Sequence, residues 1–267
     1  MPRTVSQGDL ANAHRFAHRF AHRFGEPTAV YKIDSRTVVR SSSGIRLAEA
    51  ETMKFVRNNT SIPVPEVYNA YKDDESGHTR IIMEFIDGVA LEEAWDAYSV
   101  TEKESVITQL RGYMEELRQI KGTFIGAVDG SWCDDHFFDG DCGGYGPFKD
   151  EDDFNAGIIK ALKQGKSPVP TRISMTCEMF LETMKGHEIV FTHNDFAPRN
   201  ILVQGSKVVA IIGWELAGYY PDYWEYCNAM RRPDWHSGWV TERALDKILQ
   251  PRLRELSVMW NTTEILW

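Results

Sequence analysis

The chain of 267 residues lacks both a long apolar run and an excess of basic charge. Near its most informative motif the longest uninterrupted apolar stretch, Val208 to Ile212, is far too short to cross a bilayer. The formal net charge is −9, whereas a protein that binds nucleic acid needs a concentrated basic surface. We therefore expect neither a membrane partner nor a nucleic-acid partner.

Cysteine is also scarce, and its spacing forms no known pattern. The four cysteines include no C-x-x-C pair, so we expect reduced thiols rather than a disulfide framework. The N-terminus lacks the succession of basic, apolar and small residues that is typical of a secretory signal. These features predict a cytoplasmic protein. Its 42% of hydrophobic residues can form the core of one large domain or of two lobes.

The N-terminus carries a tandem repeat, AHRFAHRFAHRF, over residues 13–24. A period of four places the phenylalanines on one stripe of a helix and the histidines on a neighbouring stripe. We expect a helix that docks its phenylalanine stripe on the body of the protein. Two other interpretations are a metal held by histidines spaced i, i+4, and an arginine-rich targeting segment.

The next part of the chain is rich in β-branched residues. Asp34-Ser35-Arg36 separates two such segments, which suits a hairpin. Pro63 and Pro65 favour an extended segment, and the apolar residues before them recur at helical spacing. The predicted order is two strands, a helix, an extended segment and a strand, over 28–33, 37–42, 44–59, 61–71 and 79–88.

Beyond Gly88 the pattern becomes mostly helical. Thr101 and Glu104 suit a capping box at the start of the longest predicted helix. We predict an α+β chain with a β-rich N-lobe over 1–87 and a helical C-lobe over 88–267. Helices are expected over 90–98, 101–121, 154–163 and 173–185, with an acidic, glycine-rich loop over 126–153.

The segment FTHNDFAPRNILV contains the pattern H-x-D-x-x-x-x-N as His193, Asp195 and Asn200, directly after an apolar strand. Phosphoryl transfer requires a carboxylate beside the attacking hydroxyl and an oxygen ligand for magnesium on one rigid loop. In that interpretation Asp195 orients or deprotonates the acceptor, Asn200 holds a metal and His193 braces the loop. Taken alone, the same residues would also suit turns closed by side-chain hydrogen bonds.

This loop resembles that of the aminoglycoside phosphotransferase and choline kinase-like family, most closely its fungal-type members. IIGWELAGYYPDYWEY matches the family's I-D-W-E-x-A-G segment at almost every position. RLAEAETMKFV, SIPVPEVY and IIMEFIDGVALEEAW match its N-lobe helix, proline segment and hinge, so the resemblance covers most of the chain. It implies a two-lobed, protein-kinase-like fold, a nucleotide cleft between the lobes with Met83 and Glu84 at the hinge, and a small-molecule substrate.

One departure from the family concerns the residue that grips the nucleotide phosphates. The family has a lysine on the third strand, paired with a helix glutamate, where this chain has Arg40, with Glu49 or Glu51 as its partner. Lys32, on the preceding strand, is an alternative. Arginine keeps the charge, but its planar fork reaches differently from an ammonium group.

A second departure concerns the metal. The family's metal-holding aspartate precedes Trp214-Glu215, and this chain has Gly213 in its place. Magnesium relies on one or two carboxylates plus phosphates in such sites, so the loss should greatly weaken a metal–nucleotide complex. Asn200 and Glu215 are the remaining candidate ligands.

Three functions of different classes follow. The first, which we favour from the sequence, is an enzyme that requires no cofactor. It would use Asp195 and His193 as acid and base in a cyclisation, elimination or isomerisation of a small organic metabolite. The second is a phosphotransferase that uses ATP and Mg²⁺ and acts on a small-molecule hydroxyl. The third is a pseudokinase that only binds a ligand or partner.

The sequence leaves the class of small-molecule substrate open. Asp134 and Asp135 of the acidic loop could receive a cationic amine, as in the related antibiotic and choline kinases. A solvated acidic loop is the more ordinary interpretation. Trp214 and Glu215 are further candidate substrate contacts, while aromatic residues such as Trp132 would suit a hydrophobic metabolite.

Overall fold

The computed structural model describes residues 3–16, 29–135, 145–164, 169–231 and 234–266. The chain divides into two compact units. The first unit consists of Met1–Gln109 and Ala197–Glu215, and the second of Leu110–Phe196 and Leu216–Trp267. The lobe boundary that the sequence suggests near residue 87 stays a prediction.

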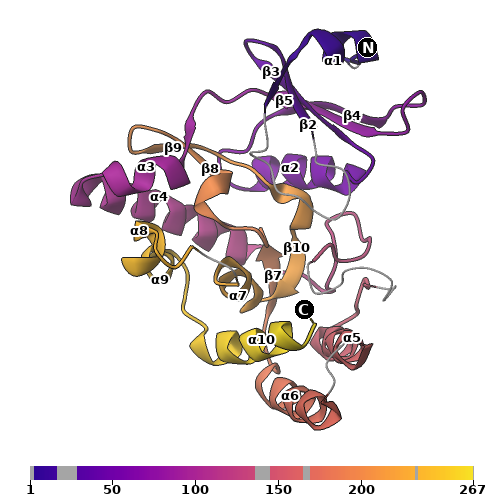
Figure 1. Cartoon of the computed structure of the whole chain (residues 1–267), viewed down its shortest axis with the longest axis vertical. Coiled ribbons are helices and arrows are strands. Elements are labelled where there is room, and N and C mark those ends of the chain that lie inside the picture. Colours follow the sequence, from indigo (N-terminus) through magenta and orange to yellow (C-terminus); the bar gives the residue numbers. More distant parts are fainter. Residues whose placement is uncertain (1–2, 17–28, 136–144, 165–168, 232–233, 267) are drawn as a thin grey trace. The chain divides into compact units, whose positions relative to one another are not determined.

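The first unit is built on an antiparallel sheet of five strands in the order β1-β2-β3-β5-β4 (Figure 1). The central strands β3 and β5 are buried along most of their length, as expected for strands with a neighbour on each side. Asp34 closes the turn between β2 and β3 by accepting a hydrogen bond from the backbone N–H of Arg36 at 2.8 Å, so the predicted hairpin is confirmed. The strands are β1 (His14–Phe16), β2 (Ala29–Asp34), β3 (Thr37–Ser42), β4 (Val67–Lys72) and β5 (Thr79–Glu84).

Alternation along β3 sorts its side chains between two environments. Val39 belongs to a buried cluster to which helix α1 (Gln7–Asn12) contributes Leu10. Val38 and Arg40, one residue to either side, line a pocket instead. Successive side chains of a strand point to opposite faces, so the burial of Val39 in the cluster turns Arg40 towards the pocket. Helix α2 (Leu47–Asn59) contributes to the same pocket and packs against β4 and β5 along one face of the sheet (Figure 1).

A second, three-stranded sheet in the first unit carries part of the motif region. Its order is β6-β8-β9. Strand β8 begins directly after Asn200, and β9 ends two residues before Gly213, so the hairpin holds both ends of this segment. The elements are β6 (Val89–Ala90), α3 (Leu91–Ala94), η1 (Trp95–Ala97), η4 (Pro198–Asn200), β8 (Ile201–Gln204), β9 (Lys207–Ile211) and η5 (Trp214–Leu216).

The second unit is mostly helical around a core of aromatic side chains. Trp224 packs edge-on against Phe154 at 4.9 Å between ring centroids and stacks on Tyr220 at 5.8 Å. A two-stranded antiparallel ribbon, β7 (Ile189–Thr192) with β10 (Gly218–Pro221), enters this core. The helices are α4 (Val100–Gln119, which begins in the first unit), α5 (Glu151–Gln164), α6 (Pro170–Thr183), α7 (Trp224–Ala229), α8 (Gly238–Thr241), α9 (Ala244–Ile248) and α10 (Leu253–Leu266). The predicted α+β class is confirmed.

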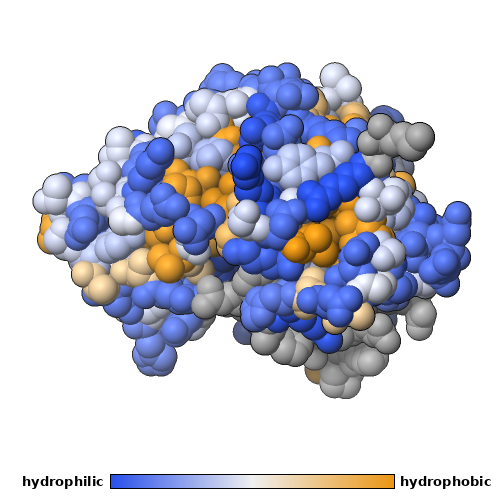
Figure 2. All heavy atoms as spheres, turned by 90° about the horizontal axis from the view of Figure 1, so that it is seen from above, coloured by the Kyte–Doolittle hydropathy of each residue, from blue (hydrophilic) through white to orange (hydrophobic). Residues whose placement is uncertain are grey.

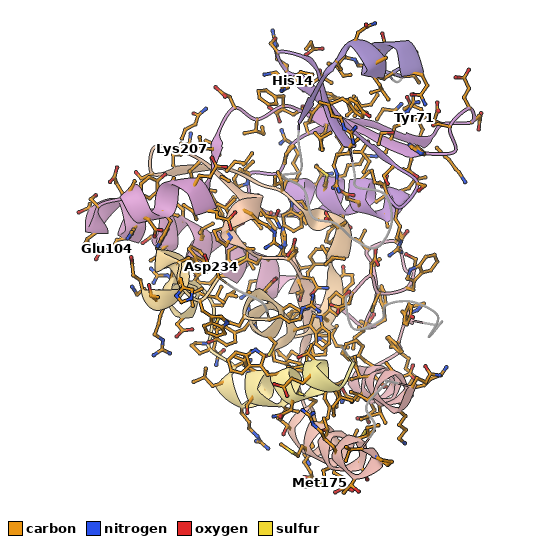
Figure 3. The ribbon with its side chains drawn as sticks, in the orientation of Figure 1. His14, Tyr71, Glu104, Met175, Lys207 and Asp234 are labelled. Atoms are coloured by element: carbon orange, nitrogen blue, oxygen red, sulfur yellow. The ribbon has the colours of Figure 1, made fainter. Side chains whose placement is uncertain are left out.

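Within the described ranges, no helix combines the length and the apolar character needed to cross a membrane. Apolar side chains reach the surface in separate patches among hydrophilic ones (Figure 2). In the second unit, Met175 of α6 points outward from its helix (Figure 3) and is 59% exposed.

The helix predicted for the N-terminal repeat is wrong where the structure describes it. His14–Phe16 form β1, with His14 opposite Lys32 and Phe16 opposite Val30 of β2, and α1 ends before the repeat. Because four is a multiple of two, a period of four fits the alternation of a strand as well as a stripe on a helix. The repeat from residue 17 onward lies outside the described residues.

The predicted capping box of α4 is displaced by two residues. Glu102 Oε2 accepts a hydrogen bond from the backbone N–H of Ser99 at 2.9 Å, and Glu102 N donates to Ser99 Oγ at 3.4 Å. The segment SVTEKE contains two overlapping S/T-x-x-E patterns, so the sequence does not distinguish Ser99 from Thr101. The helix begins at Val100, which makes Ser99 the residue that caps it.

Gly218 of β10 offers a test of the packing in the second unit. A Cβ at this position would lie 2.5 Å from the carbonyl oxygen of Gly126, which accepts a backbone hydrogen bond from Tyr219. Because backbone cannot move aside as a side chain can, we expect Gly218→Ala to lower the free energy of unfolding by roughly 1–3 kcal/mol in chemical denaturation. Gly112→Ala in α4, where no atom lies within 4 Å of the added Cβ, should instead raise it by about 1 kcal/mol. Equal stability of the two variants would contradict this packing.

Candidate functional site

The first unit contains a pocket with mostly apolar walls. Its lining comes from β2, β3, α2, the end of β5, β8 and the segment after β9. Met83 and Glu84, which the sequence assigns to a hinge, both line it. The charged lining residues are Arg40, Glu49 and Glu84. A flat apolar ligand with a charged end would suit such a lining.

Two lining residues of this pocket, Arg40 and Glu49, come together with Glu215. Arg40 Nη1 contacts Glu49 Oε1, and these two side chains are only 5% and 3% exposed. Glu215 Oε2 lies 3.4 Å from the same nitrogen. Burial acts to lower the pKa of Arg40, but the two carboxylates outweigh it, so this pKa is raised. Burial raises the pKa of Glu49 to about 7, although Arg40 acts to lower it.

Lys32, the alternative to Arg40, and Glu51, the alternative to Glu49, make other contacts. Lys32 Nζ is 3.5 Å from the centroid of the Phe85 ring and makes a cation–π contact there. Glu51 is 56% exposed and pairs with Lys54 at 2.9 Å on the surface of α2. Arg40 and Glu49 are therefore the buried pair that joins β3 to α2.

Gly213 lies directly against Asn200. Its φ of +82° is in the left-handed region, and a Cβ added there would be 2.8 Å from Asn200 Cγ. The backbone N–H of Ile212 donates to the carbonyl oxygen of Asn200 at 2.9 Å and holds the two segments together. Trp214, a predicted substrate contact, is instead a core residue: it is 1% exposed, and its indole N–H donates to the Ile211 carbonyl oxygen at 2.9 Å.

This unit contains groups that could hold a magnesium-bound nucleotide. Within the described residues, Arg40 Nε and Glu49 Oε2 are buried without a hydrogen-bond partner, and both side chains line the pocket. A guanidinium group is well matched to phosphate oxygens. No group of three or more His, Cys, Asp or Glu in the described part of the chain could hold a metal ion. Magnesium held mainly by phosphates and water needs fewer protein ligands, and Asn200 and Glu215 could supply them.

In the second unit, β7 leads directly into the predicted catalytic loop. Asn194 adopts a left-handed backbone with φ of 68°, and the N–H of Asp195 donates to His193 Nδ1 at 3.2 Å. His193 is fully buried, whereas Asp195 is partly exposed. His193 thus supports the backbone of Asp195 from the inside, and Asp195 is the residue that a substrate could reach.

A buried carboxylate from α7 holds the backbone of this loop. Glu225 accepts hydrogen bonds from the N–H of His193 at 2.6 Å and of Asn194 at 3.0 Å. Burial raises the pKa of Glu225 to about 7, although both hydrogen bonds and Arg118 act to lower it. Our sequence reasoning missed Glu225. The available signal was an acidic residue inside the aromatic segment YPDYWEY.

Asp135, a predicted substrate contact, belongs to the same scaffold. It is fully buried, and its Oδ2 accepts hydrogen bonds from Asn194 Nδ2 at 2.8 Å, Trp224 Nε1 at 2.9 Å and Asn228 Nδ2 at 3.0 Å. Asp135 therefore satisfies buried donors and does not lie in a solvated loop, and its role as a substrate contact stays a prediction. Asp134 is partly exposed, and residues 136–144 of the acidic loop lie outside the described ranges.

The raised pKa of Glu225 makes stability depend on pH. A folded-state pKa of about 7, above the ordinary value of 4.5, means that the contribution of this group is fully present below pH 4.5 and is lost as the pH rises through 7. The loss amounts to at most about 3 kcal/mol. We expect the free energy of unfolding to differ less between pH 5 and pH 8 in Glu225→Gln than in the parent, while the share due to Glu49 remains. Glu178→Gln, an exposed change on α6, is the control, and an unchanged pH dependence in Glu225→Gln would contradict the raised pKa.

Comparison with solved structures places this fold among aminoglycoside phosphotransferases. A thermostable mutant of APH(4)-Ia in ternary complex with AMP-PNP and hygromycin B is 17% identical, with a TM-score of 0.65 over 97% of this chain and 86% of that one. The ternary complex of streptomycin, ATP and APH(2″)-IIa is 16% identical, with a TM-score of 0.61 over 96% and 82%. ADP-bound APH(2″)-Ib is 16% identical, with a TM-score of 0.62 over 92% and 84%. These likenesses show a shared aminoglycoside phosphotransferase-like fold.

Sequence comparison gives the family. No curated protein sequence matches the chain. Residues 22–255, which are most of its length, match the model named APH and described as the phosphotransferase enzyme family. The chain belongs to the phosphotransferase enzyme family.

Proposed function

We propose that this chain is an ATP-dependent phosphotransferase that acts on a hydroxyl group of a small molecule. The observation that carries the proposal is the buried ion pair of Arg40 and Glu49 in a pocket with mostly apolar walls. Taking two charges out of water is costly, and apolar residues of similar volume would often serve stability as well. Phosphate binding by a guanidinium that is held in place would explain why a charged pair is buried here. Membership of the phosphotransferase family supports the same activity.

Residues that line the pocket, together with Asn200 and Glu215 nearby, would share the binding of the nucleotide. The apolar walls, which include Val38 and Leu202, would hold the base. Arg40, oriented by Glu49, would bind phosphate oxygens. Asn200 and Glu215 would hold Mg²⁺, which when bound neutralises the charge of the transferred phosphoryl group.

Asp195 would be the residue that acts on the acceptor hydroxyl. Asp195 would orient the hydroxyl or remove its proton, while His193 and Glu225 keep the loop backbone in place. Asp134 remains a candidate contact for a cationic amine. The solved structures with hygromycin B and streptomycin support an antibiotic-like, hydroxyl-bearing acceptor as the first class to test.

Gly213 favours a second candidate, acid–base chemistry without a nucleotide. A chain with no carboxylate at this position has less use for magnesium. In this candidate Asp195 and His193 would act as base and acid. However, His193 is fully buried and its Nδ1 accepts a hydrogen bond from the backbone N–H of Asp195, which leaves this ring poorly placed for proton transfer. We therefore place phosphoryl transfer first.

Nucleotide binding is the primary test. A ligand that binds only the folded state at 100 times its dissociation constant adds about 2.7 kcal/mol of stability, so ATP with Mg²⁺ should raise the melting temperature. Calorimetric titration with ATP and GTP, with and without Mg²⁺, gives the affinities. Arg40→Gln keeps a polar side chain but removes the charge, and it should abolish most of the binding. A parent protein that binds neither nucleotide would leave acid–base chemistry as the better proposal.

Two substitutions at Gly213 distinguish the effect of an added metal ligand from the effect of placing any side chain on this left-handed backbone. Asp and Asn have the same shape, and both enter the left-handed region more readily than most residues. Gly213→Asp adds a carboxylate beside Asn200, so we expect it to tighten the Mg²⁺-dependent binding of ATP measured by calorimetry. Gly213→Asn should not tighten it. Equal effects of both variants would mean that this position does not face the metal.

Asp195→Asn distinguishes an enzyme from a pure binding protein. The amide keeps the shape of the carboxylate but cannot accept a proton, so phosphoryl transfer from labelled ATP to a panel of hydroxyl-bearing amines should fall on the order of 10²–10⁴-fold. The melting temperature and the affinity for ATP should change little. Full transfer activity in the variant would show that the loop does not carry the chemistry.

A further inference from the structure

Glu215 lies beside Arg40, the residue that binds the phosphate groups in the proposed function. Its Oε2 lies 3.4 Å from Arg40 Nη1, although the two residues are 175 positions apart in sequence. The Glu215 side chain is 22% exposed, whereas Glu49 on the same guanidinium is 3% exposed. Glu215 is therefore the carboxylate that can turn away into solvent, because moving Glu49 would leave a charge buried alone.

Two carboxyl groups lie at the guanidinium of Arg40. Glu49 contacts Arg40 Nη1, and Glu215 Oε2 lies 3.4 Å from the same nitrogen. Both carboxylates act to raise the pKa of Arg40, which shows that both reach it electrostatically. A nucleotide without metal would add several more negative charges at this place. Like charges within a few ångströms of one another repel strongly where water is partly excluded.

We propose that Glu215 makes this pocket selective for metal-bound nucleotide, by competing with free phosphate groups for Arg40. This inference rests on the proposed function and adds a residue that sets its specificity. In the absence of metal, a phosphate must displace the Glu215 carboxylate from Arg40 and then remain beside it. With Mg²⁺ on the phosphates, the same carboxylate becomes an attractive group that can turn from Arg40 towards the cation.

The assignment explains why a chain with Gly213 can still depend on metal. Glu215 lies two residues after Gly213, and Asn200 lies against Gly213. The family resemblance predicts an aspartate at position 213, and this chain lacks it. The Glu215 carboxylate, two residues later, is already held close to Arg40, to which we assign the phosphates. To bind Mg²⁺, Glu215 must give up its ion pair with Arg40. An aspartate at position 213 that made no such ion pair would not lose one.

The experiment compares metal-free and metal-bound ligands in Glu215→Gln. The amide keeps the size of the side chain and removes its charge. By calorimetry in EDTA, we expect ADP and inorganic tripolyphosphate to bind the variant about tenfold more tightly than the parent, because the competing charge is gone. In Mg²⁺ the gain should vanish or reverse, so the ratio of metal-bound to metal-free affinity falls.

Glu51→Gln is the matched control. It removes the same charge from exposed Glu51, two residues from Glu49 in α2, where the partner is Lys54 rather than Arg40. This variant should bind all ligands as the parent does, and melting temperatures of all three proteins confirm that they are folded. Metal-free affinity that is unchanged or weaker in Glu215→Gln, or a gain of equal size in Glu51→Gln, overturns the inference.

Tripolyphosphate separates this inference from the proposed function. If tripolyphosphate shows the expected gain but no nucleotide binds, the competition at Arg40 stands and nucleotide use is refuted. If nucleotides bind in Mg²⁺ but Glu215→Gln changes neither ligand in EDTA, the proposed function stands and the role of Glu215 is refuted. If no polyphosphate or nucleotide binds any of the folded proteins, both are refuted.

Discussion

The buried ion pair between Arg40 and Glu49 is the interaction on which the arrangement of the first unit depends. It joins β3 to α2, and its side chains are 5% and 3% exposed. Removing either partner would leave the other charged and buried, which costs more than the pair itself contributes. The pair thus fixes the position of one cation in a pocket with mostly apolar walls, and that cation in turn attracts Glu215.

The second unit uses buried carboxylates in another way. Glu225 and Asp135 accept hydrogen bonds from N–H groups of the loop and its neighbours. Glu225 holds the backbone of Asn194, while Asp135 holds its side chain. Asn194 is kept in a left-handed conformation between them, and the direction of the chain into Asp195 follows from it.

The two units therefore assign different physical work to acidic residues of similar burial. In the first, Glu49 orients the guanidinium of Arg40, and the partly exposed Glu215 lies beside the same guanidinium. In the second, carboxylates satisfy backbone and side-chain donors that would otherwise be buried without partners. Acidity alone suggested a substrate contact at Asp135, whereas its burial and hydrogen bonds place it in the scaffold of the loop.

The sequence by itself determined the elements whose periodicity is unambiguous and the order of the motifs, including β3, α2 and the strand before His193. It did not determine β1, because a period of four fits a helix and a strand, and pairing with β2 decided between them. Nor did it choose Arg40 over Lys32, or Glu49 over Glu51, because each choice depends on which face of an element is buried. Glu225 and Asp135 meet their partners across 31 to 93 residues of sequence, and such contacts exist only once the chain has folded. Local spacing in the sequence indicates which side chains lie on the same face of a helix or strand. Only tertiary packing decides which residues lie opposite that face.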